Sequence, residues 1–183
     1  MIMSQRKKIL PLLLGLLLMP CQLIGQETTK PELPAAIKSA LDRKFPGWKF
    51  APVSDEIRRF LRENVSTDTR PEMISGDFDG NGRLDYAVLI EHGNIFNEKR
   101  QPIGKNIYVV AFLRKGAGFK LYVLEKGNNE YLALSKKGEK DYSYQTDQNF
   151  VYAHDAVFAG IFDKGGSSFI YRNGRFHSVI TSD

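Results

Sequence analysis

Residues 76–91 read Gly-Asp-Phe-Asp-Gly-Asn-Gly-Arg-Leu-Asp-Tyr-Ala-Val-Leu-Ile-Glu, an acidic, glycine-rich run followed by an apolar one. Side chains that carry oxygen recur within the first run at Asp77, Asp79, Asn81 and Asp85. Gly80 and Gly82 permit the sharp backbone turns that bring such oxygens inward. Calcium takes six to eight oxygen ligands, and tight loops supply them from alternating positions. The stretch therefore predicts a calcium-binding loop.

The residues after the loop distinguish between two kinds of calcium loop. An EF-hand places a bidentate glutamate at its twelfth position and continues into a helix. Counting from Asp77, the twelfth residue is Val88, and residues 85–91 form an apolar, β-branched run. Such a run is typical of a strand. The sequence therefore predicts a calcium turn between two strands, and it excludes an EF-hand.

Gly76 to Val88 resembles the calcium-binding motif of the FG-GAP/VCBS repeat family, and the resemblance is confined to these residues. It implies an ion held by four side chains and one main-chain carbonyl: those of Asp77, Asp79, Asn81 and Asp85, and the carbonyl of Arg83. The family usually joins several repeats into a β-propeller. This chain has one copy in 183 residues, so we expect no propeller. A glycine- and aspartate-rich hairpin turn without metal remains an alternative.

Helical and strand signals lie on opposite sides of the loop. Apolar residues at helical spacing predict helices over residues 35–45 and 55–64, the second capped by Ser54. Residues 107–113 and 119–124 predict a hairpin, and Asn173-Gly174 predicts another near the end of the chain. The predicted fold class is α+β, with two N-terminal helices followed by an antiparallel β-meander of roughly six to eight strands and a calcium-type loop between strands.

The first 25 residues have the pattern of a secretory signal peptide. Three basic residues precede an apolar segment, residues 9–19, that is too short to span a bilayer. Cleavage after Gly25 leaves a linker at residues 26–34 and a single domain at residues 35–183. We therefore expect an exported protein, periplasmic or secreted, with no membrane span after cleavage. An N-terminal membrane anchor and a lipid anchor on Cys21 remain as alternatives.

Charge and cysteine content limit the kinds of partner and metal site that the mature protein can have. The chain has 26 basic and 21 acidic residues, a net charge of +5. Removal of residues 1–25 leaves 23 basic and 21 acidic residues, a net charge of +2. That charge does not favour nucleic-acid binding. Cys21 is the only cysteine, so the mature domain would have neither disulfides nor thiolate metal sites.

The residues that could carry other chemistry are few. His92, His154 and His177 lack the spacing of a metal site, although Asp155 could orient the imidazole of His154. The leading hypothesis is therefore a non-enzymatic exported protein with a structural calcium loop and an unknown protein or glycan partner in the envelope or outside the cell. One alternative is an envelope or extracellular hydrolase, or a hydrolase inhibitor, with a cleft around His154, Asp155 or Glu91. A second is a carbohydrate-binding or adhesion module that uses exposed aromatic side chains.

Overall fold

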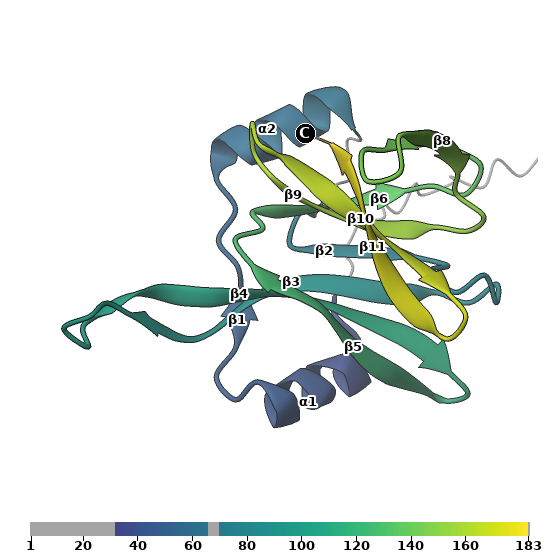
Figure 1. The fold of residues 1–183 in the computed structure, drawn as a ribbon. Helices are drawn as coiled ribbons and strands as arrows, with labels where there is room; N and C mark the ends of the chain where they lie inside the picture. The colour runs from purple at the N-terminus through teal and green to yellow at the C-terminus, as the bar shows by residue number, and fades with distance from the viewer. Residues whose placement is uncertain (1–31, 66–69, 183) are drawn as a thin grey trace, which may run out of the picture. The chain divides into compact units, whose positions relative to one another are not determined.

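The computed structural model describes residues 32–65 and 70–182 (Figure 1). The predicted signal peptide, Cys21 and most of the predicted linker lie outside the described residues. The described elements are, in chain order, α1 (Ala35–Lys44), β1 (Lys49–Phe50), α2 (Asp55–Asn64), β2 (Met73–Gly76), β3 (Asp85–Phe96), β4 (Pro102–Lys115), β5 (Gly118–Gly127), β6 (Tyr131–Ser135), β7 (Lys140–Ser143), β8 (Gln148–Val151), β9 (Ala156–Ile161), β10 (Gly165–Arg172) and β11 (Arg175–Ser182). Neither helix is long and apolar enough to cross a membrane.

The strands form two main antiparallel sheets. The first sheet has the order β1-β3-β4-β5, and β2 pairs with β3 as well. Because β1 pairs with β3 at Ile90 and Glu91 and β2 pairs with it at residues 85–88, the two short strands share one edge of β3. The second sheet has the order β11-β10-β9-β6, and β7 and β8 form a separate two-stranded ribbon. The loop from β2 to β3 therefore lies within the first sheet.

The main core lies between the two sheets. Leu89 and Ala111 from the first sheet and Val157 and Phe169 from the second belong to one buried cluster. The other face of the first sheet is covered by α1 (Figure 1), whose Ile37 packs in a second cluster with Val88 and Phe112 of the sheet. Burial on both faces explains why residues 87–90 of β3 are all apolar.

The predicted α+β class is wrong, because the described structure is mainly antiparallel β. Strands account for 53% of it and helices for 14%. Helices do form at Ala35–Lys44 and Asp55–Asn64, where the sequence predicts them, but each has only ten residues. The strands also do not follow one another as a meander, because β6 pairs with β9 and β2 shares β3 with β1. Short helices cover the sheets here and do not form a layer of their own.

Both predicted hairpins are confirmed. β4 and β5 pair antiparallel around the turn at Gly116. Asn173 and Gly174 join β10 to β11 with φ angles of 52° and 84°, the left-handed conformations that a two-residue hairpin turn requires. Local turn chemistry thus determines both of these connections.

The β3–β4 hairpin extends beyond its neighbours as a two-stranded arm, residues 92–106 (Figure 1). Pairing with β1 ends at Glu91 and pairing with β5 ends at Ile107, so no third strand in the described part of the chain flanks the arm. Its turn is ordered by Asn97, whose side-chain oxygen accepts a hydrogen bond from the Gln101 backbone N–H at 2.9 Å. The arm is therefore a preformed projection.

Candidate metal centre

The predicted calcium loop connects β2 to β3, so the strand-loop-strand arrangement is confirmed. Gly80 and Gly82 have φ angles of +73° and +75°, in the left-handed region that side chains with a Cβ rarely adopt. A Cβ at Gly80 would also lie 3.3 Å from Cδ2 of His154. The two glycines therefore allow the loop to turn tightly and to approach the second sheet.

Hydrogen bonds within the loop fix its shape. Both carboxylate oxygens of Asp77 accept backbone N–H groups, from Asn81 and from Gly82, each at 2.9 Å. The side-chain oxygen of Asn81 accepts the Arg83 N–H at 2.9 Å. Each carboxylate oxygen has two lone pairs, so these bonds leave Asp77 able to bind a cation as well.

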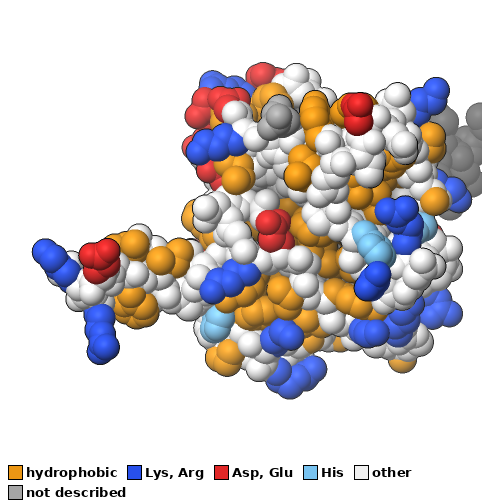
Figure 2. Space-filling model, viewed as in Figure 1, with side chains coloured by type: hydrophobic (Ala, Val, Ile, Leu, Met, Phe, Trp, Pro, Cys, Tyr) orange, Lys and Arg blue, Asp and Glu red, His pale blue; other side chains and the backbone are white. Residues whose placement is uncertain are grey.

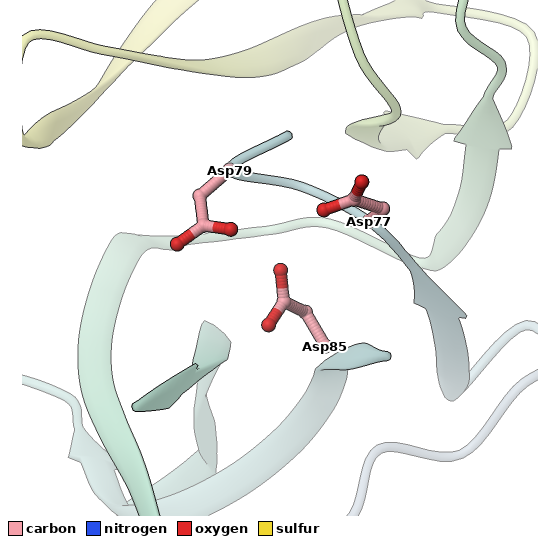
Figure 3. Close-up of side chains that lie close together, drawn as sticks. All are labelled: Asp77, Asp79 and Asp85. Atoms are coloured by element: carbon pink, nitrogen blue, oxygen red, sulfur yellow. The ribbon is translucent and has the colours of Figure 1, made fainter. Parts of the chain in front are cut away.

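Three of the predicted ligands converge. One carboxylate oxygen each from Asp77, Asp79 and Asp85 lies within 4.8 Å of the others. Figure 3 shows the three carboxylates pointing toward one another, from the end of β2, the loop and the start of β3. Carboxylate oxygens are the ligands that calcium prefers. The residues present therefore fit a hard divalent cation.

Asp85 is the most deeply buried of the three, with no exposed surface. Its carboxylate accepts the backbone N–H groups of Arg114, at 2.6 Å, and Phe78, at 3.0 Å. Burial raises the pKa of Asp85 above its ordinary 3.8, and the charge of Asp79 raises it further, although the hydrogen bond from Arg114 opposes the shift. Without a cation the folded protein therefore retains this proton to a higher pH than the unfolded chain does. The contribution of Asp85 to the stability of the folded protein therefore falls as the pH rises from 3.8 through the pKa that Asp85 has in the folded state.

Asp79 has an unsatisfied oxygen. Its side chain is only 3% exposed, and Oδ2 accepts a hydrogen bond from Lys115 Nζ at 2.5 Å. Oδ1 is buried and has no hydrogen-bond partner among the described residues. A buried carboxylate oxygen without a partner carries a desolvation penalty of about 1–3 kcal/mol or more. A cation bound beside Asp77 and Asp85 would satisfy it.

Asp155, the residue before β9, holds the acidic loop from the side of the second sheet. Asp155 accepts the Asp77 N–H on one carboxylate oxygen, at 2.9 Å, and the Lys137 N–H on the other, at 3.0 Å. Nδ1 of His154 lies 3.3 Å from the backbone oxygen of Asp155 and not from its carboxylate. Asp155 therefore fastens the acidic loop, and it does not orient the imidazole of His154.

The other two predicted ligands lie in the same loop. Asn81 and Arg83 are both exposed, and the amide oxygen of Asn81 accepts the Arg83 N–H. Binding of calcium by the Asn81 side chain and the Arg83 carbonyl stays a prediction. Sequence reasoning missed Lys115 and Asp155, which contact the loop from positions 36 and 78 residues away from their partners. No local pattern marks contacts of that range.

The remaining candidates are dispersed. His92 packs edge-on against Phe45, and Nε2 of His177 accepts a hydrogen bond from Arg175. A pocket between β5 and β11 has a volume of about 410 Å³ and contains neither a histidine nor a carboxylate; its lining is Tyr122, Val123, Leu124, Phe169, Arg175, Phe176 and Ser178. The exposed aromatic side chains in the described ranges are Phe60 on α2, Phe96 on β3 and Tyr144 in the turn after β7, and they form no row.

No family model, curated protein or solved structure matches the chain. The resemblance of residues 76–88 to the FG-GAP/VCBS motif therefore rests on those residues alone. The geometry of the acidic cluster is the principal guide to function.

Proposed function

We propose that this is an exported, non-enzymatic protein whose β2–β3 loop binds one calcium ion and thereby fastens the two sheets together. The observation that carries the proposal is the buried, unpartnered Oδ1 of Asp79 beside two further carboxylates. Asp77 also joins the loop to the second sheet through its N–H bond to Asp155. An ion held by Asp77, Asp79 and Asp85 would neutralise charges that otherwise repel one another inside the protein.

A calcium titration of the purified protein, by calorimetry or by competition with a fluorescent chelator, tests the proposal. We expect one ion per chain, with magnesium binding more weakly because it requires stricter octahedral geometry. Asp79→Asn should weaken calcium binding by at least about tenfold, because it removes one charged ligand and about 1.4 kcal/mol or more of binding free energy.

Asp163→Asn is the matched control, because Asp163 is exposed and its φ of 56° suits asparagine. This variant should bind calcium like the wild type. Absence of binding by the wild type, or equal binding by the Asp79 and Asp163 variants, would contradict the proposed site.

The projecting arm supports a partner-binding role as the second part of the proposal. Ile103 is 64% exposed and Phe96 is 55% exposed, on a ribbon that no other strand among residues 32–65 and 70–182 covers. The arm carries Lys99, Arg100 and Lys105 against Glu98, a net charge of +2. Figure 2 shows its hydrophobic and basic side chains together on the projection. We propose that an acidic protein of the envelope or extracellular space binds the arm, with Ile103 and Phe96 entering an apolar groove of that partner.

A photo-crosslinking amino acid placed at Phe96 tests the arm in the cells that produce the protein. Val151 is the matched control position, because it is also 55% exposed but lies on β8 of the body. We expect a discrete adduct from position 96 that is lost when Ile103→Ser is added, and no adduct from position 151. No adduct at position 96, or the same adducts at both positions, would reject the arm as the binding surface.

A further inference from the structure

Lys115 contributes a positive charge at the acidic cluster. It is the last residue of β4, and its Nζ donates to Oδ2 of Asp79 at 2.5 Å. The same ammonium lies 6.0 Å from the centre of the Tyr171 ring, on β10 of the second sheet. The hydrogen bond from Lys115 to Asp79 is the main cause that raises the pKa of Lys115 above its ordinary value. Among the described ion pairs, this is the one that involves a residue of the cluster.

The burial of the two partners differs sharply. Asp79 is 3% exposed, whereas Lys115 is 48% exposed. A lysine side chain is flexible and its ammonium is strongly hydrated, so Lys115 can move into solvent when another cation takes its place beside Asp79. Asp79 has no such freedom because its side chain is buried. The carboxylates are therefore the fixed part of the centre and the ammonium is the movable part.

We propose that Lys115 acts as a built-in antagonist of calcium, a tethered cation that lowers the affinity of the site. This inference rests on the proposed calcium function. An ammonium on Asp79 repels a divalent cation bound to the same carboxylates, whether it stays in place or has to be displaced. The coupling is reciprocal, so calcium binding weakens the Lys115–Asp79 pair by the same factor. The site would then bind calcium less tightly than the same carboxylates would without Lys115.

Calcium affinities of four proteins at one ionic strength test this inference: the wild type, Lys115→Met, Lys115→Arg and Lys120→Met. Methionine keeps an apolar side chain of similar length but removes the charge, whereas arginine keeps the charge. Lys120 is the matched control, because it lies on β5, the strand next to β4. Its ammonium lies 4.9 Å from the centre of the Tyr122 ring. Lys120→Met thus removes one charge of the same sign without removing a contact to Asp79.

We expect Lys115→Met to bind calcium at least about tenfold more tightly than the wild type, because a single and a double positive charge a few ångströms apart repel appreciably even with aqueous screening. Lys115→Arg and Lys120→Met should stay within about threefold of the wild type. In the presence of a chelator, Lys115→Met should also melt at a lower temperature, since the carboxylates lose their counter-charge. Tighter calcium binding together with a lower melting temperature in chelator would show that the variant gains affinity through the lost charge and not through a general gain in stability.

Unchanged affinity in Lys115→Met would overturn the inference while leaving the calcium site intact. Weaker binding in that variant would also overturn it, and would make Lys115 a residue that positions Asp79 for the ion. Failure of all four proteins to bind calcium would instead show that the proposed function itself is wrong.

Discussion

Replacing Phe78 by alanine is expected to lower the free energy of unfolding by about 3–5 kcal/mol, the usual cost of emptying a buried aromatic site. Phe78 is fully buried in the cluster between the sheets, although it is the second residue of the acidic loop. Its neighbours Asp77 and Asp79 are two of the clustered carboxylates. The variant should therefore also bind calcium more weakly, because the loop loses its anchor in the core.

Urea denaturation in the presence of a chelator measures this effect without any contribution from calcium. Phe96→Ala is the control, since Phe96 is largely exposed on the arm and its loss should change the stability by no more than about 0.5 kcal/mol. Equal stability losses in the two variants would show that the loop is not anchored through Phe78.

Asp85→Ala is the second variant with a large expected effect. It removes the carboxylate that accepts the backbone N–H groups of Phe78 and Arg114. The buried Phe78 N–H and the part-buried Arg114 N–H then lose this hydrogen-bond acceptor. Each unsatisfied donor costs about 1–3 kcal/mol, so we expect a loss of about 2–5 kcal/mol even without calcium. The variant should also fail to bind calcium, because its most deeply buried ligand is gone.

Asp42→Ala is a suitable control for this loss. Asp42 also accepts a hydrogen bond, from Nε1 of Trp48, but at an exposed site where water can replace it. A loss below about 1 kcal/mol in the control and a larger one in Asp85→Ala would assign the effect to burial. Denaturant midpoints with and without calcium distinguish the structural part of the loss from the ion-dependent part.

The sequence predicts local structure well wherever one short segment determines it. Ser54 caps α2 as predicted, since its hydroxyl oxygen accepts the Ile57 N–H at 3.2 Å. Asn173 and Gly174 form the predicted turn because few other residue pairs tolerate positive φ angles in succession. The acidic loop follows the same rule, since its glycines and alternating oxygens are all within nine residues.

The sequence does not predict which segments pair when they lie far apart along the chain. The short apolar run of β6 marks a strand, but it does not indicate that the partner is β9 and not β5 or β7. The predicted meander was wrong for this reason, because strand periodicity is the same for every possible neighbour. The same limit hid Lys115 and Asp155. Their side chains reach the loop only after the strands have paired and the sheets have packed.

Thermal unfolding of the protein in calcium and in a chelator tests the central claim most directly. With calcium at about 100 times its dissociation constant, binding contributes about 2.7 kcal/mol and should raise the melting temperature by roughly 5–11 °C for a domain of this size. Asp79→Asn should show no more than about half of this rise, because binding that is at least tenfold weaker contributes about 1.4 kcal/mol or less at the same calcium concentration, and the variant lacks the carboxylate whose Oδ1 is unpartnered. Identical melting curves of the wild type in calcium and in chelator would contradict the account.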